Sequence, residues 1–288
     1  MANIGVVLAG GASKGAYELG VLYALREYFG MSNIRCISSA SIGSIIAQTF
    51  GMGKEEELCD KWKNVDTNKH GKFFLAYSGK EYFRNALDGM MDNYKKLPFE
   101  HYVSVWNYSK HKVEYIPMHT LCKDSLKKYL RGAISIPFFS KGELIEGDRI
   151  LDGAFLDNIP AYPLVDKDLD YIFCVYFDNC RYIFENETFD KKIIKLFDFP
   201  NLKRLEIMKY NTDVFSDMVG YGYDYTIRVV KELFENKKNN DEIYKAIADR
   251  EQNTHCEYKH RLTADVVLNN LNIAAQKYSK RLSTREKV

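Results

Sequence analysis

Several features that define common classes of protein are absent from this sequence of 288 residues. No window approaches the roughly 20 apolar residues that a membrane-spanning helix requires, and no secretory signal peptide is visible at the start. The formal net charge is only +2, which gives no indication of nucleic-acid binding. Internal repeats and low-complexity segments are also missing. We therefore expect a cytoplasmic protein that has no membrane-spanning helix and binds no nucleic acid.

Residues that bind metals are present, but not in a pattern that indicates a metal site. The six cysteines lack a zinc-like spacing, and we expect them to be free thiols in a reducing compartment. The histidines lie in no segment with evident special chemistry; they are His70, His101, His111, His119, His255 and His260. His255, Cys256 and His260 are close in sequence, but their spacing fits no strong metal-binding pattern.

The first part of the chain alternates apolar runs with helical patterns. Residues 4–9 read as a short buried strand, and residues 14–29 place apolar side chains on one helical face. A second strand at 34–38 is followed by a helix of small and apolar residues at 42–50. Repeated strand–turn–helix units predict an α/β fold with a mainly parallel sheet.

The remaining elements follow from similar patterns. Residues 55–91 look mostly helical, residues 102–108 and 112–119 favour a β-hairpin, and residues 120–130 favour a helix capped by Thr120. Residues 170–177 are apolar almost throughout, which is typical of a central strand.

The composition changes after about residue 180. Helical periodicity returns in four later segments, which are 203–214, 224–234, 241–250 and 264–280. We therefore predict an α/β core over residues 1–180 and a helical region over 181–288 that packs on it. Residues 191–199 place lysines beside bulky apolar residues, so this segment is either a peripheral membrane contact or an ordinary amphipathic segment packed on the core.

One short motif, residues 39–43 (SASIG), lies between a predicted strand and a predicted helix. A serine nucleophile on a tight strand-to-helix turn needs small neighbours two positions away, and here these are Ser39 and Gly43. The helix that follows would point its amides and its dipole at Ser41. The alternative is that Ser41 only caps the helix.

A glycine-rich stretch, residues 10–15 (GGASKG), joins the first strand to the first helix. It fails the Walker pattern, because Ala16 and Tyr17 follow Gly15. It loosely resembles a dinucleotide-binding loop, but no acidic residue follows the second strand. Two other interpretations are an oxyanion-binding loop and a simple tight turn. In the first of these, Lys14 would add positive charge or fix the loop.

Asp152 precedes Gly153 at the end of another short apolar run. Asp-Gly pairs usually mark turns only. A serine nucleophile needs a base, however, and Asp152 is a candidate for that role.

Taken together, these segments resemble the patatin-like phospholipase family. The family's glycine-rich loop is similar to residues 10–17 (GGASKGAY), and its G-x-S-x-G motif is similar to residues 39–43. A middle block is similar to residues 133–139 (AISIPFF), and the D-G-[GA] motif with a following Asn-x-Pro is similar to 152–154 (DGA) and 158–160 (NIP). The four motifs occur in the family's order over roughly residues 4–180.

This resemblance implies a three-layer α/β/α fold and hydrolysis of lipid acyl esters without a metal or other cofactor. It implies a Ser–Asp dyad in place of a triad, with Ser41 as nucleophile, Asp152 as base, and an oxyanion loop made by Gly10, Gly11 and Ala12. Lys14, Gly15, Gly43 and Gly153 would support these turns. Ser39 departs from the family pattern, which has glycine there, and this bears on the rate more than on the fold.

Three functions therefore stay open from the sequence. The first is a serine hydrolase that acts on lipid esters, and the second is a silent protein of the same fold that binds lipid or a partner. The third is a nucleotide-binding α/β protein that uses the loop at residues 10–15.

Overall fold

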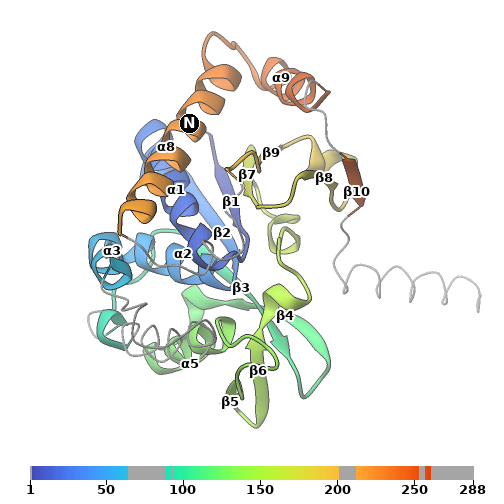
Figure 1. Cartoon of the computed structure of the whole chain (residues 1–288). Coiled ribbons are helices and arrows are strands. Elements are labelled where there is room, and N and C mark those ends of the chain that lie inside the picture. Colours follow the sequence, from blue (N-terminus) through green and yellow to red (C-terminus); the bar gives the residue numbers. More distant parts are fainter. Residues whose placement is uncertain (1, 64–87, 92–93, 201–211, 253–256, 261–288) are drawn as a thin grey trace, which may run out of the picture.

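The computed structural model describes residues 2–63, 88–91, 94–200, 212–252 and 257–260. A mixed sheet of eight strands lies at the centre of this part of the chain (Figure 1). Its parallel half has the order β3 (Glu100–Asn107), β2 (Ile34–Ala40), β1 (Ile4–Leu8), β7 (Tyr171–Val175) and β9 (Ile193–Leu196). The strands β4 (Lys112–Pro117), β5 (Glu143–Ile145) and β6 (Asp148–Asp152) extend it with antiparallel pairs.

Both faces of the parallel half are buried. Alternate residues of β1 contribute to two separate hydrophobic clusters, with Val6 in one and Val7 in the other. The same alternation separates Phe173 from Cys174 in β7. A strand that is buried on both faces reads as a continuous apolar run, which explains why β1 and β7 were recognisable in the sequence.

Helices cover one face of this sheet. In chain order they are α1 (Gly15–Phe29), α2 (Ile42–Met52), α3 (Glu55–Lys63), α5 (Lys123–Ala133), α8 (Thr212–Phe234) and α9 (Asn240–Gln252). The other face carries shorter pieces, including the helical turn Tyr162–Leu164, the helix α6 (Glu187–Asp190) and β8 (Cys180–Ile183), which pairs with β10 (Glu257–His260). The layered α/β class with a mainly parallel sheet is thus confirmed.

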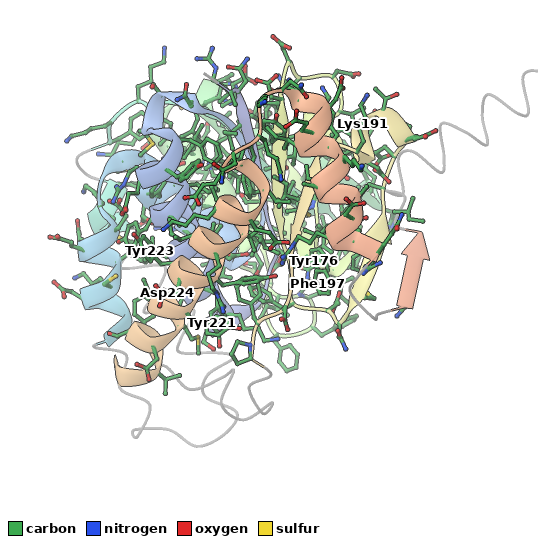
Figure 2. The ribbon with its side chains drawn as sticks, turned by 90° about the horizontal axis from the view of Figure 1, so that it is seen from above. Tyr176, Lys191, Phe197, Tyr221, Tyr223 and Asp224 are labelled. Carbon is green, nitrogen blue, oxygen red and sulfur yellow. The ribbon has the colours of Figure 1, made fainter. Side chains whose placement is uncertain are left out.

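The two long helices α1 and α8 cross at close range, as Figure 2 shows from above. A Cβ atom on Gly20 would lie 2.1 Å from the Val219 carbonyl oxygen, and one on Gly222 would lie 2.2 Å from the Tyr17 carbonyl oxygen. The hydroxyl of Tyr223 donates to Glu27 at 2.8 Å across the same contact. Glycine at these two positions therefore lets the helix backbones touch.

Most local predictions agree with the structure. The hairpin is formed by β3 and β4, and the helices at 224–234 and 241–250 lie within α8 and α9. The helix predicted from Thr120 instead begins at Lys123, because Thr120 belongs to the short 3-10 turn Met118–Thr120, where its hydroxyl donates to the Pro117 carbonyl oxygen. Much of the helix predicted over 55–91, all of the one over 264–280, and most of the one over 203–214 lie outside the described residues, as do His70, His255 and Cys256.

The prediction that the chain becomes helical from residue 181 is wrong for the first part of that region. Residues 193–196 form β9, which pairs in parallel with β7 and is buried along its whole length. The segment 191–199 is therefore no exposed membrane contact, since Leu196 is fully buried and Phe197 stacks on Tyr176 (Figure 2). An apolar run of four residues with a lysine inside it has no helical or strand period of its own, so only the pairing with β7 decides its structure.

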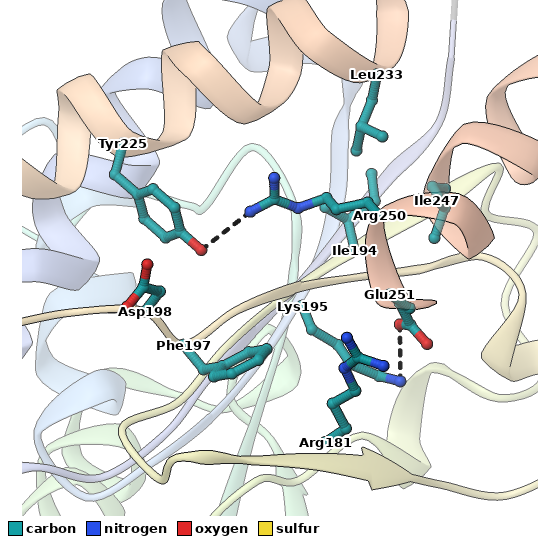
Figure 3. Close-up of a pocket in the computed structure, with 10 residues that line it drawn as sticks. All are labelled: Arg181, Ile194, Lys195, Phe197, Asp198, Tyr225, Leu233, Ile247, Arg250 and Glu251. Atoms are coloured by element: carbon teal, nitrogen blue, oxygen red, sulfur yellow. Dashed lines mark hydrogen bonds and ion pairs between the residues drawn. The ribbon is translucent and has the colours of Figure 1, made fainter. Parts of the chain in front are cut away.

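Lys195 of β9 finds its partner on α9. Its ammonium group is buried and lies 2.8 Å from Glu251, and Arg250 donates to the Tyr225 hydroxyl of α8 (Figure 3). A small cavity of about 70 Å³ lies between these groups, β9 and α8. The lysine that suggested a membrane surface is thus part of the contact between the sheet and the C-terminal helices.

We expect Gly222→Ala to lower the free energy of unfolding by about 2 kcal/mol or more, because its new methyl group would overlap the backbone of α1. Gly220→Ala is the matched control, since Gly220 is exposed on the same helix with no atom within 4 Å of a Cβ, and it should be neutral or stabilising by up to ~1 kcal/mol. Urea denaturation of both variants measures the difference. Equal stabilities would contradict the close crossing.

Candidate active site

The site begins at the turn between β2 and α2. Ser41 follows the last residue of β2 and has φ 49° and ψ −124°, a conformation that is costly for a residue with a side chain. Its carbonyl oxygen accepts hydrogen bonds from the amide and the hydroxyl of Ser44, at 3.0 and 2.5 Å. A Cβ on Gly43 would lie 2.9 Å from Leu8, so the turn packs directly on β1 and needs glycine there. This geometry is the strained strand-to-helix turn that the motif predicts.

The position of Asp152 is determined by β3. In the described chain β4 pairs with β3 over residues 102–107, while β2 pairs with 100–104 and β6 with 105–107. Because β4 occupies one edge of β3, β2 and β6 must meet end to end on the other edge. Ala40 is opposite Ser104 and Asp152 is opposite Val105, so the ends of the two strands are neighbours.

This arrangement brings the two candidate residues into contact. The Ser41 hydroxyl donates to Oδ2 of Asp152 at 2.6 Å. The other carboxylate oxygen of Asp152 accepts from the Ala154 amide at 2.9 Å, and the Asp152 amide donates to the Ser135 carbonyl oxygen at 2.9 Å. Asp152 is buried, with two hydrogen bonds to its carboxylate and one from its backbone amide.

Gly153 has a packing role next to this pair. A Cβ on Gly153 would lie 2.4 Å from the carbonyl carbon and oxygen of Ser104, so the turn after Asp152 lies against the backbone of β3. Glycine in the D-G-[GA] motif is therefore needed for the approach of two backbones.

The glycine-rich loop lies beside both turns. A Cβ on Gly10 would be 2.8 Å from Cβ of Ser41 and 3.0 Å from Cβ of Ala154. The Gly10 amide donates to Asn158 Oδ1 at 2.8 Å, and Asn158 Nδ2 donates back to the Gly10 carbonyl oxygen at 3.2 Å. The side chain of Asn158 thus holds the loop through both the amide and the carbonyl group of Gly10. The sequence singled out Asn158 as part of a motif but gave no sign of this contact.

The next two residues of the loop differ from Gly10. In the described part of the chain, the amides of Gly11 and Ala12 donate to no other group. Ala12 has φ 52°, a left-handed conformation that turns the backbone sharply at this point. Amides that are free in a tight turn at the start of a helix are suited to bind an anion.

Lys14 and Gly15, at the end of the loop, contact neighbouring elements. The Lys14 ammonium lies 5.1 Å from the centre of the Phe177 ring, and burial lowers its pKa, although the charge of Asp178 opposes that shift. A Cβ on Gly15 would lie 3.0 Å from Ile42, so α1 and α2 meet closely at their first residues.

Ser39 stands at the position where the motif expects glycine, and it is fully buried. Its hydroxyl lies 2.9 Å from Nε2 of His101 and 3.3 Å from the Tyr102 carbonyl oxygen, both on β3. Burial lowers the pKa of His101 to about 3, with a smaller effect from His119. The serine is thus accommodated by a polar partner that sequence reasoning missed, because a histidine inside a strand pattern carries no local signal.

No group of side chains in the described residues could hold a metal ion. Nor does any helix among them have the length and apolar character needed to cross a membrane.

The fold and this site define an α/β protein with a serine on a strained turn, a buried aspartate beside it and a glycine-rich loop against both. A family model of patatin-like phospholipases matches residues 6–165, and the chain belongs to this family.

Individual relatives are distant. The chain is 24% identical over 189 residues to "Lysophospholipase NTE1" of Mycosarcoma maydis, which covers 60% of this chain and 10% of that protein. It is 26% identical over 196 residues to "Lysophospholipase nte1" of Neurospora crassa, which covers 60% and 12%. The chain thus spans about a tenth of the length of these curated relatives.

Two solved structures are similar in part. One is VipD from Legionella pneumophila, at 14% identity and a TM-score of 0.47 over 80% of this chain and 67% of that chain. The other is ExoU from Pseudomonas aeruginosa in complex with SpcU, at 15% identity and a TM-score of 0.34 over 79% and 53%.

The buried, neutral state of His101 predicts a pH dependence of stability. Because the pKa is lowered in the folded state, the unfolded state takes up the proton first, and stability present above pH 6.5 is lost as the pH falls towards 3. At pH 5 the loss from this one group is on the order of 2 kcal/mol.

The measurement is urea denaturation of wild type and His101→Asn at pH 7 and pH 5. The stability difference between the two proteins should shrink by roughly 2 kcal/mol at pH 5, since the variant has no group to protonate there. A difference that does not change with pH would show that His101 is not held neutral.

Proposed function

We propose that this protein is a serine hydrolase that cleaves carboxylic ester bonds of phospholipids or related lipids. The observation that carries the proposal is the 2.6 Å hydrogen bond from Ser41 Oγ to Asp152 Oδ2. A nucleophile needs a base within hydrogen-bond reach, and this pair has that geometry. Membership of the patatin-like phospholipase family supports lipid esters as the substrate class.

The first half of the proposed reaction forms an acyl-enzyme. Asp152 takes the proton of Ser41 as its oxygen attacks the ester carbonyl carbon, which gives a tetrahedral intermediate with a negatively charged oxygen. That intermediate collapses by breaking the bond to the alcohol, and Asp152 returns the proton to the departing oxygen. The hydrogen bond from the Ala154 amide keeps the carboxylate aimed at Ser41 throughout.

The second half hydrolyses the acyl-enzyme. Asp152 removes a proton from water as the water attacks the acyl carbon, and the bond to Ser41 Oγ then breaks with return of that proton to the serine. The products are the free fatty acid and the enzyme in its starting state, so every proton is accounted for and no metal or cofactor takes part in the scheme.

The amides of Gly11 and Ala12 are the proposed donors to the charged oxygen. An oxyanion donor of this kind contributes on the order of 3 kcal/mol to transition-state stabilisation. The Gly10 amide, which the sequence suggested as a third donor, is already bonded to Asn158. Gly10 is therefore proposed to provide the close approach to Ser41, while the dipole of α2 adds positive potential behind the nucleophile.

The alternative is a silent lipid-binding protein of the same fold, suggested by Ser39. A fluorophosphonate probe separates the two, because it labels only an activated serine; labelling that disappears in Ser41→Ala supports the hydrolase. The nucleotide-binding alternative is less favoured, because Asn158 occupies an amide of the loop that would have to bind phosphate.

We expect Ser41→Ala and Asp152→Asn each to lower ester hydrolysis at least ~10³-fold with the fold intact. Asparagine keeps the size of the aspartate and accepts a hydrogen bond, but it cannot take up the serine proton. The measurement is fatty-acid release from a lipid panel, with circular dichroism as a check on folding. His101→Asn is the control, and an equal loss in that folded variant would refute the dyad.

We expect Asn158→Ala to lower kcat about 10–100-fold with a smaller change in KM, because a loosened loop aims its amides poorly at the transition state while leaving substrate binding nearly as it was. Asp157→Asn is a neighbouring control that keeps hydrogen-bonding capacity towards Tyr115. Steady-state kinetics on a soluble ester checks this. A kcat equal to that of wild type would exclude a positioning role for Asn158.

A further inference from the structure

Large apolar side chains are exposed in one region of the described chain. Seven of the eight large hydrophobic residues that are exposed there lie between residues 108 and 156, and they are Tyr108, Ile136, Phe138, Phe139, Leu144, Phe155 and Leu156. Phe138 is 85% exposed and Phe155 56%. Exposed apolar side chains that gather in one place usually mark an interaction surface.

Four aromatic rings in this region form a connected set, here called the aromatic patch: Trp106, Tyr108, Phe138 and Phe155. Trp106 stacks on Phe155 with ring centres 5.3 Å apart and planes 9° apart. Tyr108 packs on Trp106 at 5.2 Å, and Phe138 packs on Phe155 at 5.8 Å. Phe138 has φ 67°, so its backbone is held in a costly conformation while its ring stays in solvent.

The aromatic patch adjoins the proposed dyad. Phe155 ends the short turn Gly153–Phe155, which begins directly after Asp152. That turn is pressed against β3 at Ser104, and Trp106 lies two residues further along the same strand. A molecule that covers the aromatic patch therefore lies beside the turn that follows Asp152.

The sheet register separates charges between the two faces of this region. Leu144 is opposite Arg149, and Leu151 is opposite Trp106, so these side chains share the face of the aromatic patch. The carboxylates of the same strands lie on the other face, since Glu143, Asp148 and Glu114 are opposite the buried residues Ile150, Ile145 and Val105. Lys110 and Lys112 form ion pairs with Asp148 and Glu114.

Among the described residues, the basic groups on the patch side form no such ion pairs. Arg149 is exposed, and its guanidinium donates to the backbone carbonyl of Lys141, whose own side chain is also exposed. The patch side therefore combines exposed rings with two cations. The carboxylates lie on the other face, near Tyr129 of α5. Burial raises the pKa of Tyr129, and so do the charges of Glu146, Glu114 and Asp148.

We infer that the aromatic patch, with Leu144, Arg149 and Lys141, docks on an anionic phospholipid bilayer. Aromatic rings insert at the boundary between head groups and acyl chains, and arginine and lysine contact lipid phosphates. A second copy of the chain is a poorer occupant, because a two-fold contact would bring two copies of the same positively charged surface together. The inference rests on the proposed function, since a lipid hydrolase must reach lipids in a membrane. It assigns the membrane contact to the aromatic patch and not to residues 191–199.

The experiment measures binding in the Ser41→Ala background, so that no lipid is consumed. Co-sedimentation uses vesicles of phosphatidylcholine alone and of phosphatidylcholine with phosphatidylserine. We expect the protein to bind the vesicles that contain phosphatidylserine. The affinity for these vesicles should fall at least ~10-fold in the double variant Phe138→Ser/Leu144→Ser. It should fall about 5-fold in Arg149→Gln, which removes one charge contact.

Tyr28→Ser is the matched control. Tyr28 is another exposed aromatic residue, but it packs on Phe234 at the end of α8, and Figure 1 shows that end on the opposite side of the molecule from β5 and β6. The control should bind as wild type does.

Trp106 provides a second readout, since the chain has only one other tryptophan, Trp62. In Trp62→Phe, brominated acyl chains should quench the remaining fluorescence when anionic vesicles are added. Equal vesicle binding by all folded variants, or absence of quenching, would overturn the inference. So would a dimer in lipid-free buffer that Phe138→Ser dissociates, since the surface would then be a protein interface.

Hydrolysis of a soluble short-chain ester separates this inference from the proposed function. Phe138→Ser should hydrolyse it as wild type does and lose activity only on vesicles. Vesicle binding through the patch without any ester hydrolysis would refute the hydrolase alone, whereas ester hydrolysis without vesicle binding would refute the docking surface alone.

Discussion

The pairing of two strands end to end along one edge of β3 is the constraint on which the site depends. β2 runs parallel to β3 and ends opposite Ser104, while β6 runs antiparallel and ends opposite Val105. Since both strands end at this point, the residues that follow them must turn out of the sheet together. Ser41 enters α2 there, and Gly153 begins a short turn that lies against the β3 backbone. Ser41 and Asp152, which are 111 positions apart in sequence, are neighbours because both strands end against β3.

Close backbone packing then supplies the rest of the site. Gly10, Gly43 and Gly153 each lie where a Cβ would overlap a neighbouring element, so the loop, the nucleophile turn and the aspartate turn can only touch one another as glycines. Asn158 completes this arrangement by bonding to both the amide and the carbonyl of Gly10. The free amides of Gly11 and Ala12 follow from the same turn, since the backbone changes direction at Ala12.

The same sheet separates two kinds of surface. Where the strands are parallel, both faces are buried and the lysine of β9 needs Glu251 as a partner inside the protein. Where the strands are antiparallel, one face is covered by α5 and the other carries exposed rings beside the aspartate turn. This difference follows a general property of sheets, in which antiparallel strands tolerate one open face whereas parallel strands do not. It places the proposed chemistry at the boundary between a rigid core and an open apolar surface.

The sequence by itself determined the α/β class, the strands β1 and β7, the hairpin and the tight turns at Ser41 and Asp152. These features depend on short-range sterics and on the spacing of apolar residues, and both are determined by residues that are close together in the sequence. Only the tertiary structure decided that residues 193–196 form a sheet strand, that Ser39 finds His101, and that the carboxylates of β4, β5 and β6 lie on one face while the aromatic patch lies on the other. These outcomes depend on which strand pairs with which and in what register. Partners that lie far apart in sequence leave no local signal, so their contacts exist only once the chain has folded.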